Sequence, residues 1–324
     1  MENVKLYLAP MAGAADGAMR RVCREHGADF AVTEMVSAAA VYYKDKKTFE
    51  LARLFEDESD CAIQIFGHEP EFISNAVKVL YEKSTVKPRS FDINMGCPVK
   101  KVVSNGDGSA LMRDIPLAAK IISAAVAASP VPVTVKMRTG WDRENINCVE
   151  LCKAAEACGA SAVCIHGRTR EDMYLSGTVD MTPVAEAKAA VNIPVIANGD
   201  ICDGKSALDA LEKTKADALM IGRAALGDPF VFGRIRAALN VEEYKEPTDA
   251  ERIKTAKYHL RLLVAQKGER VGVCEGRRHM AYYTKGMYGS AQLRQKLNTA
   301  LTFAEMINIL DEIERYVQND VTST

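Results

Sequence analysis

One cysteine has the surroundings expected of a reactive group. Cys97 lies in INMGCPVKKV, between a glycine and a proline, directly after a run of residues that reads as a buried strand. A thiol held on such a stiff turn can act as a nucleophile or as a proton donor. The eight other cysteines show no paired spacing, so we interpret them as buried thiols in a reducing, cytoplasmic environment rather than as a disulfide framework or a metal site.

Polar residues recur at the ends of the other strand-like runs. Each of them alone is more often a solvated loop residue. Together they predict one shared site, because the strands of a parallel barrel bring their carboxyl ends to a common face. In chain order the residues are Pro10, Met11 and Ala12, Glu34, Gln64, Asn94, Lys136 and Arg138, His166 and Arg168, Asn198, Gly199 and Asp200, and Gly222 and Arg223.

The last two of these strand ends have the composition of a phosphate site. In ANGDI and MIGRAALGDP, Gly199 and Gly222 permit close backbone approach and Arg223 adds a bidentate cation beside the N-terminus of the next helix. The plainer alternative is that both are ordinary turns between a strand and a helix. Lys136 could place its charge beside the electron-rich edge of a reduced flavin, or could extend to solvent. His166, taken alone, is more often a packed or solvent-facing histidine.

Eight short apolar or β-branched runs, with helical segments between them, must position these side chains. Their near-continuous apolar character is typical of parallel strands buried on both faces. Eight such units within about 230 residues favour a (β/α)₈ TIM barrel over a doubly wound sheet. The runs are Lys5–Ala9, Phe30–Thr33, Ala62–Phe66, Phe91–Asn94, Val133–Lys136, Ala162–Ile165, Val195–Ala197 and Ala218–Ile221.

The pattern changes near residue 245, where EEYKEPTD forms a polar break. We therefore predict a barrel domain over residues 1–245 and a small all-helical domain over residues 246–324, called the helical tail below. Asp249 is expected to cap a helix that begins near Glu251.

The charge of the chain is balanced overall but unevenly distributed. Its 324 residues include 42 Lys and Arg against 43 Asp and Glu, which argues against a protein that coats nucleic acid through bulk positive charge. Residues 252–296, however, contain 11 basic and 2 acidic residues, interleaved with tyrosines and histidines that could stack on exposed bases or pack the helices. We expect no secretory signal, no membrane segment of ~20 apolar residues and no obligate protein partner.

A series of motifs also carries a resemblance. LAPMAG, IQIFG, DINMGCPVKKV, KMRTGWD, IHGRTR, IPVIANGDI and ALMIGRAALGDP follow one another as in the tRNA-dihydrouridine synthases, and the chain is most similar to the bacterial B type. The segment EGRRHMAYYTKGMYGSAQLR is similar to the helical tRNA-binding domain of that family. One departure lies in the first loop, where the family commonly has AGVTD and a following aromatic residue, and this chain has AGAADGAM. We expect that loop to shape its pocket differently.

The resemblance implies an enzyme that uses FMN and NADPH to reduce the C5–C6 double bond of particular uridines in tRNA. Cys97 would be the general acid that protonates C5 after hydride addition at C6, and a thiol with an ordinary pKa of about 8.5 holds its proton at neutral pH. Asn94 and Arg138 would position the base. The residues that the resemblance assigns to the cofactor are Pro10, Met11, Ala12, Gln64, Lys136, His166, Asn198, Gly199, Asp200, Gly222 and Arg223.

Two other functions fit parts of the sequence. A different FMN barrel, such as a dihydroorotate dehydrogenase acting on a free pyrimidine, also pairs a flavin with a cysteine or serine at the rim, but it does not need a basic helical tail. An RNA-binding module on a degenerate barrel would not need Cys97, Lys136 and the phosphate loops.

Overall fold

All strands of the protein join one parallel sheet in the part of the chain that the structure, a computed structural model, describes, residues 4–287 and 290–321. The strands are β1 (Lys5–Leu8), β2 (Phe30–Val32), β3 (Val36–Ser37), β4 (Cys61–Phe66), β5 (Ser90–Met95), β6 (Val133–Arg138), β7 (Ala162–His166), β8 (Val195–Asn198) and β9 (Ala218–Ile221).

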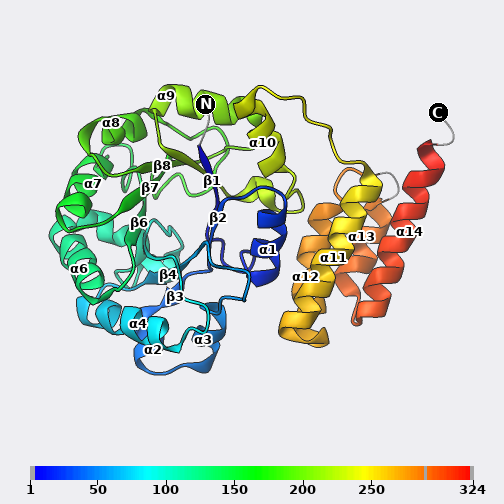
Figure 1. The fold of residues 1–324 in the computed structure, drawn as a ribbon, viewed down its shortest axis with the longest axis horizontal. Coiled ribbons are helices and arrows are strands. Elements are labelled where there is room, and N and C mark those ends of the chain that lie inside the picture. Colours follow the sequence, from blue (N-terminus) through cyan, green and yellow to red (C-terminus); the bar gives the residue numbers. More distant parts are fainter. Residues whose placement is uncertain (1–3, 288–289, 322–324) are drawn as a thin grey trace.

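The sheet closes on itself as a barrel. Its order is β2-β1-β9-β8-β7-β6-β5-β4-β3, and a further pairing of β2 with β4, in which Ala31 lies opposite Cys61, completes the ring (Figure 1). The two-residue strand β3 only extends the C-terminal end of β4, where Val36 lies opposite Ile65. The predicted (β/α)₈ barrel is therefore confirmed, with β3 as an unpredicted addition.

Helices connect the strands and cover the outside of the barrel, where the outward-facing residues Ile63, Ile65, Phe91 and Ile93 are buried beneath them. The helices of this region are α1 (Gly17–Glu25), α2 (Ala38–Tyr42), α3 (Lys46–Leu51), α4 (Pro70–Lys83), α5 (Lys100–Val103), α6 (Ile115–Ala128), α7 (Cys148–Ala157), α8 (Thr182–Ala190), α9 (Gly204–Thr214) and α10 (Val231–Asn240), with 3₁₀ turns η1 (Gly108–Arg113) and η2 (Arg223–Ala225).

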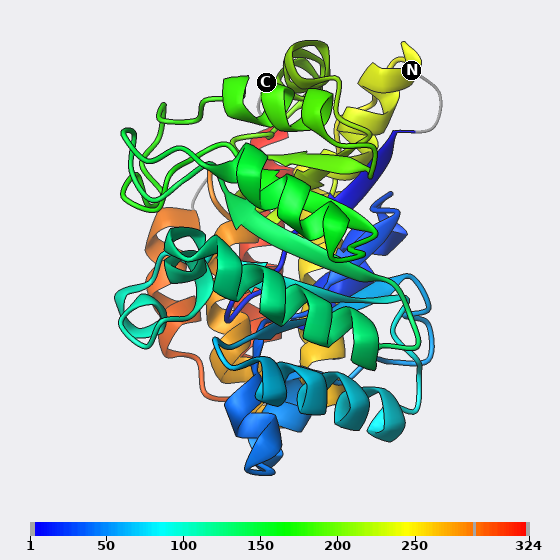
Figure 2. The same cartoon turned by 90° about the vertical axis from the view of Figure 1, so that its left-hand side faces the viewer.

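The interior of the barrel is filled by apolar residues at its middle and by polar residues toward the C-terminal ends of the strands. Successive side chains of a strand point to opposite faces, so alternate residues such as Ala62, Cys164 and Met220 share the inner face and pack together. The next inward positions along the strands carry the polar residues described below. Figure 2 shows the loops that follow these strand ends, in cyan-green and green, projecting to one side of the sheet.

In the described part of the tail, residues 246–287 and 290–321, four helices follow the barrel: α11 (Asp249–Lys267), α12 (Glu269–Tyr283), α13 (Ser290–Thr299) and α14 (Phe303–Val321). They enclose an apolar core of their own, which includes Leu260, Met280 and Leu310. Helix α11 packs against α1 of the barrel, which lies between the barrel and the tail in Figure 1.

The start of α11 corrects one expectation. Asp249 is the first residue of the helix, and the preceding Thr248 is its cap. The Thr248 hydroxyl accepts from the Glu251 amide at 3.2 Å, and the Glu251 carboxylate accepts from the Thr248 amide at 2.7 Å, which makes a capping box.

Among the residues that the structure describes, no helix is both long enough and apolar enough to cross a membrane.

Candidate active site

The inward-facing positions at the C-terminal ends of the strands bring the predicted polar residues together. Strand pairing places Asn94 opposite Lys136 and His166 opposite Asn198, and on β4 the inward-facing Gln64 lies opposite Asp92. Side chains that the sequence separates by up to 134 positions thus surround one end of the barrel, because each strand ends at the same face.

The turn that carries Cys97 is fixed by a side chain of β5. The amide oxygen of Asn94 accepts from the backbone N–H groups of Cys97, at 2.9 Å, and of Gly96, at 3.2 Å. Burial raises the pKa of the Cys97 thiol, and this outweighs the opposing effects of a backbone hydrogen bond from Val99 and of nearby cations. The thiol is therefore protonated at neutral pH, on a backbone that cannot easily shift.

Asp92, the residue that holds the Gln64 and Asn94 side chains in place, was not predicted from the sequence. Asp92, which is buried within β5, accepts from Gln64 Nε2 at 2.7 Å and from the Thr134 hydroxyl at 2.6 Å. Gln64 Oε1 in turn accepts from Asn94 Nδ2 at 2.9 Å. A chain of hydrogen bonds thus runs from β6 through Asp92 and Gln64 to the turn of Cys97, and it fixes the orientation of both amide side chains.

Lys136 does not extend to solvent. Its Nζ donates to Asn198 Oδ1 at 3.0 Å, and Asn198 Nδ2 donates to the Met220 carbonyl at 2.7 Å. This arrangement holds the ammonium group inside the barrel mouth, between β6 and β8. The alternative of a snorkelling lysine is thereby wrong.

His166 is neutral and its tautomer is set by a neighbour. Burial, followed by the charges of Lys136, Arg138 and Arg168, lowers the pKa of His166 well below its ordinary value. Arg168 Nη1 lies 3.1 Å from His166 Nε2, and because a guanidinium can only donate, Nε2 accepts. The ring proton therefore sits on Nδ1, where it is available to a ligand.

Asp200 joins Arg168, which follows β7, to Arg223 of the predicted phosphate loops. Its carboxylate accepts from Arg168 Nη2 and, at 2.7 Å, from Arg223 Nη2. Arg223 Nη1 also donates to the Tyr174 carbonyl at 3.0 Å. Asp200 thus touches the cations of the site and orients them. Gly199 has a φ of +128°, and a Cβ there would lie 3.1 Å from the His166 ring, so only glycine fits this approach.

Arg138 lies buried beside Cys97. Its Nε donates to the Gly96 carbonyl at 2.9 Å and its Nη1 to the Thr169 carbonyl at 2.6 Å. Burial lowers the pKa of Arg138 to about 10, so the group remains charged at neutral pH.

The ring of Tyr174 lies 5.5 Å from the guanidinium carbon of Arg138. Burial raises the pKa of the Tyr174 hydroxyl, and the nearby Cys97 thiol acts in the same direction. Tyr174 therefore belongs to the site, although it follows β7 by eight residues.

The comparison with known sequences decides the family. Residues 7–319 match the family described as dihydrouridine synthase (Dus). The chain belongs to the dihydrouridine synthase family. A probable tRNA-dihydrouridine synthase of Rickettsia bellii is 40% identical over 295 residues, which are 90% of this chain and 89% of the relative. The tRNA-dihydrouridine synthase B of Proteus vulgaris is 39% identical over 316 residues, which are 97% of this chain and 95% of the relative. The resemblance inferred from the motifs is confirmed.

In this dihydrouridine synthase, the first loop lies at the rim but is not entirely buried. Pro10 and Met11 are half-buried and Ala12 is exposed. Glu34, whose role the sequence left open, is turned toward this loop and its carboxylate accepts from the Gly13 amide. Glu34 thus supports the loop.

The single tryptophan of the chain also stands at this rim. Two guanidinium groups lie over the ring of Trp141, with the central carbon of Arg113 at 4.7 Å and that of Arg170 at 4.9 Å from the ring centroid. The amide of Glu171 donates to the Trp141 carbonyl at 3.0 Å, which ties the loop after β6 to the loop after β7. The loop that follows Arg138 is therefore joined to the loop that carries Thr169 and Tyr174.

The basic charge of the helical tail is partly neutralised within the molecule. Arg252, Lys257, Lys267 and Lys296 form ion pairs with acidic residues. Within residues 4–287 and 290–321, the exposed cations of the 252–296 span without an ion pair are Lys254, Arg261, Arg270, Arg278 and Lys285.

The aromatic residues of the tail divide into two groups. His259, His279 and Tyr283 are buried and pack together, with the two imidazole rings 4.5 Å apart. Tyr282 is exposed, and the guanidinium of Arg278 lies 6.0 Å from its ring. Of the two alternatives raised by the sequence, packing therefore holds for the first group, while Tyr288 lies outside the described residues.

Proposed function

We propose that the protein is a tRNA-dihydrouridine synthase that reduces the C5–C6 double bond of particular uridines in tRNA, with FMN as cofactor and NADPH as reductant. The observation that carries this proposal is a protonated cysteine, Cys97, whose backbone is held by Asn94 beside the cation Arg138, in a chain of the dihydrouridine synthase family. The family match does not favour the alternative of a free-pyrimidine dehydrogenase.

The donor groups around the barrel mouth fit FMN. Arg223 and the turns at Gly199 and Gly222 offer ligands for a phosphate, and Asp200 holds the guanidinium of Arg223 in place. Lys136 and the Nδ1–H of His166 are hydrogen-bond donors for the polar edge of an isoalloxazine ring, and Gln64 has an amide that is already oriented. Pro10, Met11 and Ala12 would line the flavin. When bound, FMN supplies the hydride that reaches C6 of the uracil.

Cys97 would supply the proton. Hydride addition at C6 places negative charge on C5 and on the C4 carbonyl oxygen of the base, so a proton donor near C5 lowers the barrier. The thiol transfers its proton to C5, and the resulting thiolate regains one from water. Because burial raises the pKa of Cys97, the donor is fully protonated at the start of each cycle.

Asn94 and Arg138 would position the uracil. One N–H of the Asn94 amide is used by Gln64, which leaves the second N–H for a carbonyl of the base. Arg138 is charged and buried next to Cys97, where a cation stabilises negative charge on a base carbonyl. The ring of Tyr174 beside Arg138 is a further surface for the base, which must leave its stack to enter the site.

The helical tail would hold the rest of the tRNA. Its free cations, among them Arg270, Arg278 and Lys285, suit the phosphate backbone, and exposed Tyr282 offers a face for an unstacked base. We accordingly assign residues 1–245 to the catalytic barrel and residues 246–324 to tRNA binding.

Mass spectrometry of tRNA from a deletion strain tests the function as a whole. We expect dihydrouridine to disappear at one or a few positions and to return when the purified protein, FMN and NADPH are added to that tRNA. Unchanged dihydrouridine in the deletion strain, or reduction of a free pyrimidine as fast as of tRNA, would refute the assignment.

A further inference from the structure

The loop between β1 and α1, residues 10–16, is fixed on its barrel side. Its turn is tight, because the amides of Ala14 and Ala15 donate to the Met11 carbonyl at 3.0 and 2.9 Å. The Ala15 carbonyl in turn accepts from Arg20 Nη1 at 3.0 Å. The loop is thereby anchored to the first helix of the barrel.

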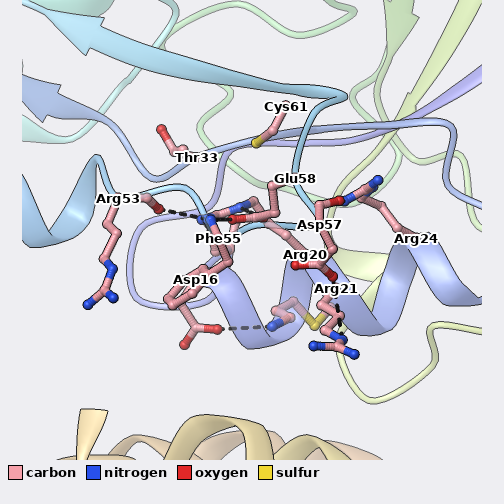
Figure 3. A network of polar contacts seen from close by, with 12 residues as sticks. Asp16, Arg20, Arg21, Arg24, Thr33, Arg53, Phe55, Asp57, Glu58 and Cys61 are labelled. Carbon is pink, nitrogen blue, oxygen red and sulfur yellow. Dashed lines mark hydrogen bonds and ion pairs between the residues drawn. The ribbon is translucent and has the colours of Figure 1, made fainter. Parts of the chain in front are cut away.

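Arg20 is itself immobilised by a buried ion pair. Its Nε and Nη2 donate to the two carboxylate oxygens of Glu58, at 2.6 and 2.7 Å, and its Nη2 also reaches the Arg53 carbonyl at 3.1 Å (Figure 3). Both side chains are almost fully buried. A bidentate pair of this kind fixes direction as well as distance, so Arg20 is a rigid support for the loop.

The other end of the loop is held by the helical tail. Lys267, the last residue of α11, donates through Nζ to Asp16 Oδ2 at 2.9 Å. Asp16 is 6% exposed, and its Oδ1 caps α1 by accepting from the Met19 amide at 3.0 Å. Burial raises the pKa of Asp16, but the charge of Lys267 and its hydrogen bond to the carboxylate outweigh this effect, so the carboxylate is ionised. The interaction is thus partly buried and charge-assisted.

The interaction is supported on the tail side as well. Glu275 of α12 also pairs with Lys267, so both tail helices that face the barrel take part. Next to Asp16, Gly17 leaves room for the tail, since a Cβ there would lie 3.0 Å from Gln266 Oε1 and 2.2 Å from the Phe55 ring. The end of α11 therefore fits closely against the start of α1.

A second polar interaction joins the same two helices far from the loop. The Tyr258 hydroxyl donates to Glu25 Oε1 at 2.9 Å, at the opposite end of α1. Both interactions link α11 to α1, but the Lys267–Asp16 ion pair is partly buried at the start of α1, whereas the Tyr258–Glu25 hydrogen bond is exposed at its end. Variants of Lys267 and Tyr258 can therefore distinguish an effect on loop 10–16 from a general weakening of the contact between barrel and tail.

We propose that Lys267 is a positioning residue for the reaction: through Asp16 it sets the loop 10–16, so that the part of the chain that binds tRNA also orders a wall of the catalytic site. This inference rests on the proposed function, because it is that function which places Pro10, Met11 and Ala12 against the cofactor.

Hydrogen exchange of the protein without added ligands tests the proposal directly. In Lys267→Met, we expect the amides of residues 13–15 to exchange about tenfold faster, while those at the C-terminal end of α1 are unchanged. Tyr258→Phe should give the reverse pattern. Asp16→Asn retains a capping oxygen but loses the charge, and it should reproduce the effect of Lys267→Met. If the amides of residues 13–15 exchange at the same rate in Lys267→Met and in Tyr258→Phe, both interactions only hold the tail against the barrel. That result would overturn the proposal.

Steady-state kinetics of the protein with bound FMN provide a second test of the proposal. Lys267→Met should lower kcat about tenfold with KM for tRNA changed less than about twofold, because small displacements of a catalytic wall are costly. Lys267→Arg should restore most of kcat, and Tyr258→Phe should leave kcat as in the unaltered protein. A rise in KM alone would show that Lys267 serves only tRNA docking. If the unaltered protein made no dihydrouridine, the proposed function would be refuted. Hydrogen exchange would still show, independently of that result, whether Lys267 holds loop 10–16.

Discussion

Cys97 differs from the other cysteines in how its backbone is held. Because Asn94 accepts from its amide and burial keeps its thiol protonated, loss of the sulfur should remove the proton donor and little else. We expect Cys97→Ala to retain bound flavin and to lower the rate of dihydrouridine formation by about 10²- to 10⁴-fold, the usual contribution of general acid catalysis. The measurement is single-turnover formation of dihydrouridine with the absorbance spectrum of the bound cofactor recorded alongside.

Cys158 supplies the matched control. It ends α7 as a half-buried thiol whose Sγ lies 3.4 Å from the Ala119 carbonyl, away from the strand ends. Cys158→Ala should turn over within about twofold of the unaltered protein, as expected of a change away from the reacting atoms. Unchanged turnover in Cys97→Ala would rule out its role as general acid.

Residues at strand ends could be predicted from the sequence, whereas their partners could not. Gln64, Asn94, Lys136 and His166 each follow from the rule that barrel strands end at the catalytic face. Asp92 lies two residues inside its strand, so its only signal was an acid in an apolar run. Tyr174 lies in an irregular loop with no spacing to place it, and its position depends on tertiary packing.

At the scale of elements, the loop between β9 and α10 lies close against α12. Gly227 has a φ of +71°, and a Cβ there would lie 2.4 Å from the carbonyl carbon of Tyr282 and 2.5 Å from the Tyr283 amide nitrogen. Gly227→Ala should therefore push the two elements apart. We expect it to cost about 1 to 3 kcal/mol for overpacking beyond the backbone strain, measured as the free energy of unfolding in urea.

Gly177 separates the two causes. Its φ of +75° imposes a similar backbone strain of about 1 to 2 kcal/mol on alanine, but a Cβ there would meet nothing within 4 Å. Gly177→Ala should thus destabilise the protein less than Gly227→Ala. If the two variants lose equal stability, the close approach to α12 makes no energetic contribution.

Element positions were predictable wherever local rules decide them. Apolar and β-branched runs identified the eight barrel strands to within two residues at each end, as expected when both faces are buried. The start of α11 was misplaced, because both Thr248 and Asp249 can cap and only the reciprocal bond with Glu251 selects the threonine. The strand β3 is two residues long and exists through its pairing with β4, which no local pattern encodes.

For the whole molecule, the segregation of charge predicts how tRNA binding depends on salt. Arg261, Arg270 and Lys285 are exposed and free of ion pairs in the described part of the chain. Changing each of them to glutamine should raise KM for tRNA and keep kcat at saturating tRNA. The slope of log KM against log salt concentration should fall by about one for each phosphate that the variant no longer neutralises.

Lys120→Gln is the control for net charge. Lys120 is an exposed cation on the outer face of α6, so its removal lowers the total charge equally without touching the tail. Its salt slope should match that of the unaltered protein. Equal slopes for Lys120→Gln and for the tail variants would show that tRNA responds to overall charge and does not bind the tail.

The net charge of residues 252–296 overstated the number of cations that are exposed and unpaired on the surface of the tail. The sequence counts every cation, but Lys257 and Lys267 are turned inward to acidic residues of α14, α12 and the barrel. Ion pairs between different helices depend on the packing of the folded chain. Composition therefore predicted a basic tail, and the structure shows which of its cations are not neutralised.

The placement of Trp141 makes the protein its own optical reporter. The chain has one tryptophan beside 11 tyrosines, so fluorescence excited selectively in tryptophan arises from a single place, the rim where the guanidinium groups of Arg113 and Arg170 lie over the indole ring. A flavin in the barrel mouth absorbs in the range where tryptophan emits, so occupancy of the cofactor site would dim this signal through energy transfer. Entry of tRNA and rearrangement of the joined loops can then be followed in real time without attaching a dye.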